Sequence, residues 1–387
     1  MPQKMEGGRV ILTTVKAVVV ASDMITPYGK GADVCRDGLF SGRTAISGLK
    51  RFNTKSFQSD QAATIDGLTY HQQDSLVIQM VRSLFDGTSA AIPEDANLIL
   101  ASTKGEIDLL EKNILEGTGD VSLCNLRSLL EKVSALTGVK DPGTAVSAAC
   151  ASSATAVARA AAMIRSGRSD CVLVIACDSV TEFVYSGFSS LMAIDKSSAK
   201  PFDKNRNGLS LGEAAAFVLM MSETRAKREE REIMGEIAGW GLSCDANHMT
   251  GPSRHAEGLV LSIKKALQSA RINERDIGFI AAHGTGTVYN DAMEMKAFHA
   301  VFKDGKRPVY SIKGAIGHTM GATGLVEIII ALRALKEKMV PPTVNLQEAD
   351  EAAHGWVSSE QCLVEKNKKA LMTNAGFGGI NAALILT

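Results

Sequence analysis

The sequence has no long apolar run and no excess of one charge, and each absence excludes a class of function. Lys and Arg together number 42, as do Asp and Glu, so no net field favours nucleic acid or an anionic membrane. The longest mostly apolar runs, such as LVEIIIAL (residues 325–332), are far shorter than the ~20 residues that span a bilayer. The first residues also lack the apolar segment and cleavage site of a secretory signal. These absences predict a cytoplasmic globular protein without nucleic-acid or membrane partners.

Metal and nucleotide motifs are missing as well. The cysteines form no C-x-x-C pair, and the sequence contains no zinc spacing, no P-loop and no strand–G-x-G-x-x-G–helix fingerprint. DKNRNG (residues 203–208) resembles the start of a calcium loop, but Ala214 stands where the loop needs Glu. Lys204 and Arg206 would also place positive charge inside the cage. The sequence therefore predicts free thiols and no metal.

Short β-branched runs alternate with longer helical patterns, which is typical of a layered α/β protein. Continuous apolar runs favour strands that are buried on both faces of a sheet. The helical stretches at 151–166 and 321–338 are almost entirely apolar or small, which predicts helices enclosed between two sheets. We expect strands at 17–22, 97–101, 171–176, 216–220, 233–242, 278–282, 309–312, 370–374 and 382–386, and helices at 75–86, 124–136, 151–166, 258–271, 292–302 and 321–338.

A charged segment, SETRAKREERE (residues 222–232), divides the chain. Each side of this segment contains a buried strand, a turn rich in Gly and Ala, and a buried helix. The pattern predicts two similar halves, residues 1–232 and residues 233–387, although the identity between them is too low to demonstrate a repeat.

One of the seven cysteines has unusual neighbours. Cys150 lies in VSAACASSATA, a stretch of small residues between an expected strand and the helix at 151–166. A helix N-terminus favours the thiolate form, and small neighbours let a thioester approach. The same pattern fits a buried cysteine that serves as a small hydrophobic residue, and the local sequence leaves both interpretations open. The other six cysteines, at 35, 124, 171, 177, 244 and 362, lack this context.

Two histidines occupy similar junctions. His283 follows an expected strand in AAHGTGTVYND, and His318 lies between a strand and a buried helix in SIKGAIGHTMGATGLVE. Each alone fits either a catalytic or a core histidine, but together with Cys150 they favour a Cys–His–His site for thiol acyl transfer. Lys313 and Glu327 flank His318 and could pair to fix its surroundings, or could form a surface ion pair.

The C-terminal stretch NAGFGGINAALIL (residues 374–386) is a Gly-rich turn between two strands. As a phosphate cradle it is weak, because no Lys-Ser or Lys-Thr follows and the turn does not precede a helix. Gly376 and Gly378 instead allow close backbone approach on either side of Phe377, and the ring of Phe377 is placed to cover a pocket.

These motifs, in this order, resemble the elongating β-ketoacyl-[acyl carrier protein] synthases of the thiolase-like superfamily. The likeness runs from about Val15 to the C-terminus. It implies an α/β fold of five layers, αβαβα, with two similar halves, the first carrying the nucleophilic cysteine and the second both histidines and a gating loop. The motifs that carry it are VSAACASS, PFDKNRNGLSLGEAAA, DANHMTGP, HGTGTVYND, KGAIGHTMGATGLVE and NAGFGGIN.

The resemblance also implies the reaction, a decarboxylative condensation that makes a 3-oxoacyl-[acyl carrier protein] in fatty acid or polyketide biosynthesis. Cys150 would take the acyl chain, and neutral His283 and His318 would stabilise the enolate formed from malonyl-carrier. The implied oxyanion hole comprises the N–H groups of Cys150 and Phe377, with Phe377 also the gate. Supporting roles are implied for Lys313 and Glu327, and substrate contacts for Thr285, Thr287, Gly376 and Gly378.

Related enzymes differ at named positions. By the same resemblance, an initiating synthase would carry Asn in place of His318, a degradative thiolase a second cysteine near Phe377, and a chain-length-factor subunit no Cys150. Departures such as GEAAA (residues 212–216) and VYND (residues 288–291) favour a specialised member.

The implied partners are an acyl carrier protein, whose phosphopantetheine carries the substrates so that no other cofactor is needed, and a second subunit. That subunit completes either a homodimer or a heterodimer with a chain-length-factor-like chain. A catalytically idle subunit is the competing binding-module interpretation. Carrier proteins are acidic, so a basic docking patch is expected, with Lys50, Arg51, Lys55 and Arg206 as candidates.

Overall fold

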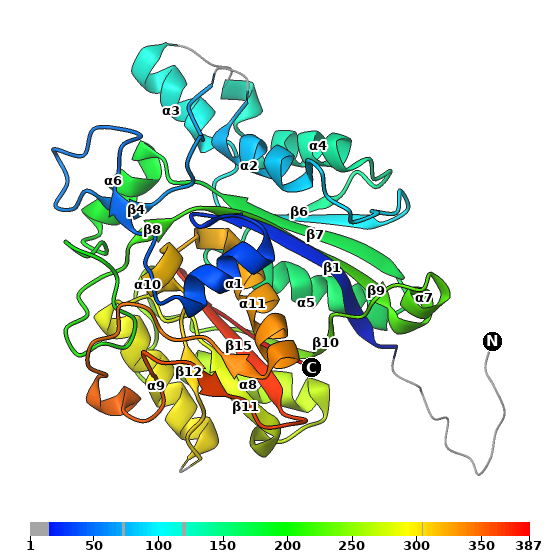
Figure 1. Cartoon of the computed structure of the whole chain (residues 1–387). Coiled ribbons are helices and arrows are strands. Elements are labelled where there is room, and N and C mark those ends of the chain that lie inside the picture. Colours follow the sequence, from blue (N-terminus) through cyan, green and yellow to red (C-terminus); the bar gives the residue numbers. More distant parts are fainter. Residues whose placement is uncertain (1–14, 72–73, 118–120, 304) are drawn as a thin grey trace, which may run out of the picture.

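The computed structural model describes residues 15–71, 74–117, 121–303 and 305–387. Two sheets alternate with three layers of helices (Figure 1). Helices α2 (Leu76–Phe85) and α4 (Leu126–Thr137) cover the outer face of the first sheet, and α8 (Glu257–Ala270) and α9 (Val288–Phe302) cover the outer face of the second. Between the sheets lie α5 (Ser152–Arg165), α11 (Thr323–Glu337) and α1 (Ala32–Phe40). The predicted five-layer α/β fold is confirmed.

The two halves repeat one strand order. In the N-terminal half the order is β1 (Ala17–Thr26), β9 (Ala214–Ser222), β7 (Cys171–Asp178), β5 (Asn97–Ala101) and β6 (Thr144–Val146). In the C-terminal half it is β10 (Gly235–Cys244), β16 (Ile380–Leu386), β15 (Lys369–Gly376), β11 (Ile277–Ala281) and β12 (Val309–Tyr310). Each half has two antiparallel pairings followed by two parallel ones, and an antiparallel contact between β1 and β10 joins the sheets. The expectation of two similar halves is therefore confirmed.

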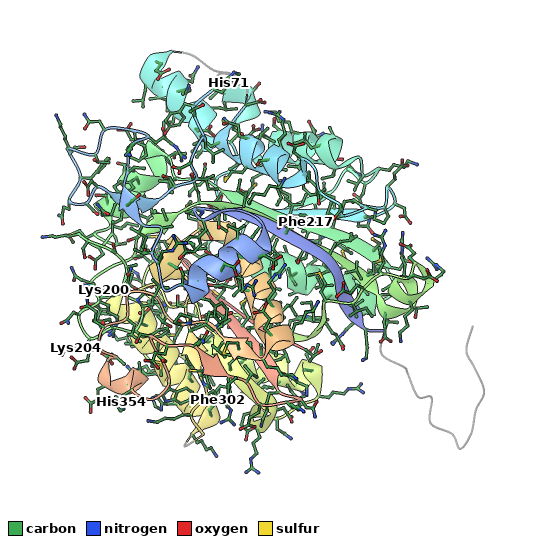
Figure 2. All side chains as sticks on the ribbon, in the orientation of Figure 1. His71, Lys200, Lys204, Phe217, Phe302 and His354 are labelled. Carbon is green, nitrogen blue, oxygen red and sulfur yellow. The ribbon has the colours of Figure 1, made fainter. Side chains whose placement is uncertain are left out.

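Strands buried on both faces explain the continuous apolar runs. In β7, Val172 and Val174 belong to the core that surrounds α5 and α11, whereas Leu173 and Ile175 belong to the core under the outer helices. Successive strand residues point to opposite faces, so a strand between two helix layers needs apolar residues at every position. Phe217 of β9 is also in the outer core (Figure 2).

The expected strands and helices are present with ends shifted by a few residues, but several elements were not expected. Helix α9 begins at Val288, four residues before its expected start, because the Thr287 side chain accepts the N–H of Asn290 and caps the helix. The charged divider forms a short helix, α7 (Glu223–Arg228), in which Arg225 is buried and pairs with Asp95 and Asp170. Helices α1, α3 (Ile107–Glu116) and α6 (Glu182–Ser190) were also missed, because their apolar residues are mixed with polar ones.

The remaining short elements are β2 (Gly29–Lys30), β3 (Ser47–Gly48), β4 (Gln61–Ala63), β8 (Leu211–Gly212), β13 (Met339–Val340), β14 (Cys362–Leu363), α10 (Lys313–Ile316), η1 (Val121–Leu123), η2 (Glu274–Asp276), η3 (Met320–Ala322) and η4 (Glu351–Ala353). The longest described helices, α9 and α11, have 15 residues, and none in the described part of the chain is long and apolar enough to cross a membrane.

Candidate active site

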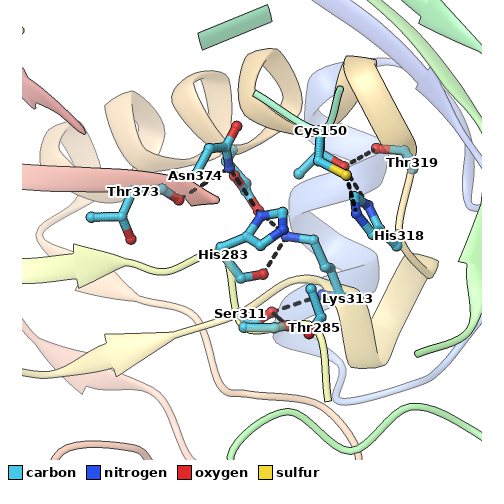
Figure 3. Close-up of polar contacts among 12 residues, drawn as sticks. Cys150, His283, Thr285, Ser311, Lys313, His318, Thr319, Thr373 and Asn374 are labelled. Atoms are coloured by element: carbon cyan, nitrogen blue, oxygen red, sulfur yellow. Dashed lines mark hydrogen bonds and ion pairs between the residues drawn. The ribbon is translucent and has the colours of Figure 1, made fainter. Parts of the chain in front are cut away.

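Cys150 lies in the turn between β6 and the buried helix α5. The preceding Ala149 has φ = 47°, in the left-handed region that small residues tolerate best. The hydroxyl of Ser152 accepts the N–H of Ala148 at 2.8 Å and donates to the carbonyl of Ala149 at 2.6 Å, which closes the turn. Cys150 is only 6% exposed, and its thiol points away from the helix toward the second half of the chain (Figure 3).

Both histidines come from the C-terminal half and meet the thiol there. His283 follows β11, and His318 lies between α10 and η3. The Nε2 atom of His318 is 3.1 Å from Sγ of Cys150, and the two imidazole rings meet edge to face with centroids 5.1 Å apart. One nitrogen of each ring and the sulfur lie within 4.8 Å of one another. Tertiary structure thus brings together the three residues that the sequence singled out.

The proton of His318 is placed by its surroundings. The backbone N–H of Met320 donates to Nδ1 of His318 at 3.2 Å, and the hydroxyl of Thr323 lies 3.1 Å from the same atom. A nitrogen that accepts a backbone N–H carries no proton, so neutral His318 is protonated on Nε2. This N–H faces Cys150.

Asn374 determines which ring nitrogen of His283 carries the proton. Its Nδ2 atom lies 3.3 Å from Nδ1 of His283 and also donates to a carboxylate oxygen of Glu327 at 2.6 Å and to the carbonyl of Thr373 at 3.0 Å. These two acceptors fix the orientation of the amide, and the contact with His283 shares one of its two hydrogens. Because an amide nitrogen donates and does not accept, Nδ1 of His283 is the acceptor and its proton sits on Nε2. Asn374 was not predicted as a site residue, although it directly precedes the Gly-rich turn.

Lys313 and Glu327 form a buried pair rather than a surface one. Lys313 donates to Glu327 at 2.5 Å and to the backbone carbonyl of His283, and each partner is 1% exposed. Burial, reinforced by the positive charge of Lys313, holds the pKa of His283 and of His318 well below the usual range. Both imidazoles are therefore neutral hydrogen-bond donors at physiological pH.

The thiol behaves differently from the sequence-based expectation. Burial raises the pKa of Cys150 to about 11, although the N–H of Phe377, the charge of Lys313 and the N–H of Cys150 itself lower it. The sequence indicated that the N-terminus of α5 favours the thiolate, and desolvation outweighs this effect and the other favourable contacts. The resting nucleophile is a protonated thiol.

A cavity of about 560 Å³ leads from the thiol to the surface. Thr285, Thr287, Gly376 and Phe377 line it, as expected for substrate contacts and a gate, and the loop at residues 245–252 forms part of its wall. Gly378 is not in the cavity wall in the described part of the chain; its N–H donates to the carbonyl of Met249 at 2.7 Å.

Phe377 lies at the tip of a tight hairpin. Gly376 of β15 pairs with Ile380 of β16, which leaves a three-residue loop in which Gly378 and Gly379 have φ = +83° and +76°. Side chains are disfavoured at these angles, so the hairpin requires both glycines. The ring of Phe377 packs against Phe188 of α6 at a centroid distance of 5.7 Å, on the cavity side.

The central loop, residues 201–216, supports His318. The N–H of His318 donates to the carbonyl of Ser210 at 2.7 Å, and the N–H of Gly212 donates to the carbonyl of His318 at 3.0 Å. A Cβ on Gly212 would come within 2.0 Å of the carbonyl oxygen of Ile316, so only glycine allows this approach.

Buried carboxylates that the sequence reasoning missed hold the turns around the site. Glu294 of α9 accepts the N–H groups of His283 at 2.8 Å and Gly284 at 2.6 Å, and the hydroxyl of Thr373 at 3.0 Å. Asp178, at the end of β7, accepts the N–H of Gly321 in the turn that follows His318. The available signal was a carboxylate in the second turn of a helix or at the end of an apolar strand.

Two of the four basic residues expected to dock a carrier protein are buried. Arg51 forms a two-point ion pair with the fully buried Glu213, and Arg206 pairs with Asp350 at 2.9 Å. Each guanidinium is paired with a carboxylate and shielded from solvent, so the assignment of Arg51 and Arg206 to a docking surface is wrong. Lys50 and Lys55 are exposed. In the former calcium candidate, Asp203 accepts the N–H groups of residues 347 and 348.

The hydrogen bonds around the site distinguish a metal site from a site that donates hydrogen bonds. A sulfur and two imidazoles at these separations are also a donor set for a soft metal ion. A metal-bound histidine normally donates its other N–H to an acceptor, which frees the ligating nitrogen. Here Nδ1 of each histidine accepts instead, from Met320 and from Asn374, so that each Nε2 carries a proton. The arrangement presents two N–H donors beside a thiol.

Such a pair of donors beside a thiol, on a two-half αβαβα fold, defines a thiolase-like condensing enzyme. Residues 130–226 match the model for the β-ketoacyl synthase N-terminal domain, and residues 234–347 match that for the C-terminal domain. The chain belongs to the β-ketoacyl synthase family.

Relatives agree along nearly the whole chain. The 3-oxoacyl-[acyl-carrier-protein] synthase 2 of Vibrio cholerae is 29% identical in an alignment of 406 positions, gaps included, which covers 96% of this chain and 98% of the relative. Nodulation protein E of Rhizobium sp. is 34% identical over 69% of this chain and 67% of its own length. A solved structure, the ishigamide ketosynthase/chain length factor, superposes with a TM-score of 0.88 at 27% identity and covers 97% of this chain and 99% of that one.

Proposed function

We propose that the chain is an elongating 3-oxoacyl-[acyl carrier protein] synthase whose reaction centre is Cys150, His283 and His318. The observation that carries the proposal is the convergence of two neutral imidazoles, each protonated on Nε2, on one buried thiol. Residues 1–232 then form the half that supplies the nucleophile, and residues 233–387 the half that supplies both histidines and the gating loop.

The first half-reaction transfers an acyl chain to the protein. The sulfur of Cys150 attacks the thioester carbonyl of acyl-carrier, the bond to the pantetheine sulfur breaks, and the thiol proton leaves on that sulfur. The N–H groups of Cys150 and Phe377 bind the oxyanion, a role supported by their contact with the sulfur in the resting protein. The products are acyl-Cys150 and free carrier thiol.

The second half-reaction forms the carbon–carbon bond. Nε2–H of His283 and of His318 donate to the thioester carbonyl of malonyl-carrier and stabilise the enolate that forms as CO2 leaves. The enolate carbon attacks the acyl carbonyl on Cys150, and the sulfur departs and takes up a proton. The low pKa values of both histidines keep their rings neutral. A neutral ring with its proton on Nε2 can donate that N–H to the enolate oxygen.

The other predicted residues support these steps. Burial keeps both imidazoles neutral, and the charge of Lys313, held by Glu327 and by the carbonyl of His283, reinforces it. The hydroxyls of Thr285 and Thr287, 2.9 Å apart, bind the pantetheine arm where it enters the cavity. Phe377 gates the acyl side beside Phe188, and Gly376, in the cavity wall, lets the backbone come close to the substrate.

The partner of the reaction is an acyl carrier protein, whose phosphopantetheine carries both substrates, so the chain needs no metal or organic cofactor of its own. We place the reaction in the cytoplasm, in fatty acid or polyketide biosynthesis. One assembly that we propose is a homodimer of this chain alone; the name of the Vibrio relative, 3-oxoacyl-[acyl-carrier-protein] synthase 2, mentions no second subunit. The ishigamide ketosynthase/chain length factor supports the alternative, in which this chain is the catalytic subunit of a heterodimer.

Intact-protein mass spectrometry after incubation with acyl-carrier tests the reaction centre. We expect a single acyl adduct on the wild-type chain and none on Cys150→Ala. A Cys150→Ala chain that still condensed would refute the assignment, and a wild-type chain without an adduct would support the idle-subunit interpretation.

Reconstitution with carriers loaded with acyl chains of graded length tests the assembly. Condensation by the purified chain alone would favour a homodimer. Activity that appears only after addition of a chain-length-factor-like subunit would favour the heterodimer.

A further inference from the structure

Asp178 is a buried carboxylate that takes no part in the proposed reaction. It is the last residue of β7, in the N-terminal half, and is 1% exposed. It accepts the hydroxyl of Ser102 at 2.8 Å, the N–H of Thr103 at 3.0 Å and the N–H of Gly321 at 2.7 Å. Every one of these partners donates, which suits an ionised carboxylate.

The bond to Gly321 crosses from one half of the chain to the other. Gly321 belongs to η3, which begins two residues after His318 and leads into α11. A Cβ on Gly321 would lie 2.6 Å from Oδ2 of Asp178, so the backbone of this turn rests directly against the carboxylate. Asp178 thereby ties the turn after His318 to the end of β7.

The turn that Asp178 holds has an unfavourable backbone. Met320, directly before Gly321, has φ = 51°, a left-handed conformation that costs an ordinary residue about 1–2 kcal/mol. Backbone of this kind persists only where surrounding contacts hold it. The hydrogen bond from Gly321 to Asp178 is such a contact.

The conformation of Met320 also decides the chemistry of His318. The N–H of Met320 donates to Nδ1 of His318 and so places the ring proton on Nε2, which is 3.1 Å from the sulfur of Cys150. If the turn relaxed, this N–H would move away, and the ring could take the other tautomer or rotate.

We infer that Asp178 is a positioning residue for His318: from the N-terminal half, it holds residues 318–321 in the conformation that keeps Nε2–H of His318 directed at the reacting oxygen. The inference rests on the proposed function, because the decarboxylation step is where His318 acts.

Asp178→Asn tests this role. The asparagine keeps one oxygen acceptor, and in either orientation its NH2 group faces a backbone N–H, that of Gly321 at the Oδ2 position or that of Thr103 at the Oδ1 position. We expect CO2 release from malonyl-carrier by the acylated enzyme to fall about 10–100-fold in kcat, as for a misplaced catalytic group. KM for malonyl-carrier and the rate of acyl transfer to Cys150 should stay within about threefold, because neither depends on the tautomer of His318.

Gly321→Ala provides a second variant that retains the carboxylate. The added methyl group pushes the turn from Asp178, so the same selective loss of CO2 release is expected, and this variant replaces Asp178→Asn if the latter fails to fold. Ser102→Ala is the matched control, since it removes a donor to Asp178 that does not contact the turn. It should leave CO2 release within about twofold of wild type.

The outcomes distinguish a failure of the positioning role of Asp178 from a failure of the proposed function. Wild-type rates of CO2 release in both Asp178→Asn and Gly321→Ala would overturn the positioning role. An equal loss of acyl transfer and CO2 release would also overturn it, because it would indicate a general structural defect. A wild-type chain that neither becomes acylated nor releases CO2 would instead refute the proposed function.

Discussion

The two halves of the chain have one topology and place different side chains at equivalent turns. In each half, a turn after the edge strand, β6 or β12, leads to a buried helix, α5 or α11. The N-terminal turn carries Cys150, and the C-terminal one carries His318, and these two residues contact each other between the sheets. In the proposed reaction, equivalent positions in a repeated fold thus supply the acyl-carrying thiol and one of the two imidazoles.

The turns after β5 and β11, the strands next to the edge strands, differ more. After β11, the turn presents His283, and Glu294 holds it through two backbone N–H groups. After β5, the turn at residues 102–105 presents no catalytic side chain, and Asp178 holds it. Each half therefore fixes this turn with a buried carboxylate, but only the C-terminal half adds chemistry to it. The two halves share one scaffold, while the groups of the proposed reaction are divided between them.

Removal of the functional group from each half gives the largest expected effects. Cys150→Ala should abolish the acyl adduct, whereas His318→Ala or His283→Ala should still form it and lower CO2 release from malonyl-carrier about 10²–10³-fold, the usual cost of losing an oxyanion donor. Mass spectrometry and CO2 release measure the two steps separately. If His318→Ala lost the adduct as completely as Cys150→Ala, the halves would not divide the reaction in this way.

The buried pair of the C-terminal half should matter more for stability than an exposed pair. Lys313→Met leaves the carboxylate of Glu327 buried without its cation, so the free energy of unfolding should fall by about 3–5 kcal/mol. Denaturant unfolding measures the loss. The matched exposed pair is Lys204 with Glu348, where Lys204→Met should cost less than about 1 kcal/mol. Similar losses in the two variants would contradict the comparison.

The contact between helix and sheet in the C-terminal half depends on glycine. A Cβ on Gly241 of β10 would lie 2.0 Å from the carbonyl oxygen of Ser262 in α8, so Gly241→Ala should destabilise the protein by about 1–3 kcal/mol. The control is Gly187→Ala in α6, where the added methyl group has no atom within 4 Å apart from its chain neighbours and the backbone of its own helix. That variant should keep or slightly raise the melting temperature, and a comparable drop in both would argue against the close contact.

The last prediction concerns the pH dependence of the Cys150 thiol in the unmodified protein. Because the pKa of Cys150 is about 11, the reactive thiolate is a small fraction at neutral pH and grows about tenfold per pH unit. The rate of alkylation by iodoacetamide at Cys150 should therefore keep rising from pH 6 to pH 9, with Cys150→Ala used to subtract the other cysteines. A plateau below pH 8 would indicate a thiolate stabilised by the N-terminus of α5.

Much of the fold was predictable because its signals are local. Strands between two helix layers are apolar at every position, so β5, β7 and β9 stood out, and α5 and α11 stood out by their small and apolar residues. Helices such as α3 and α6 escaped because tertiary contacts, rather than a clear apolar stripe, stabilise them. Cys150, His283 and His318 were found because each lies in a run of small residues at a strand–helix junction.

The sequence by itself determined which residues could react and the order in which the strands and helices follow one another. Only the tertiary structure decided how the reactive residues behave. Burial made Cys150 a protonated thiol, Met320 and Asn374 set the protons of the two histidines, and salt bridges hid Arg51 and Arg206. These properties depend on desolvation and on contacts between residues distant in sequence, which local patterns do not encode.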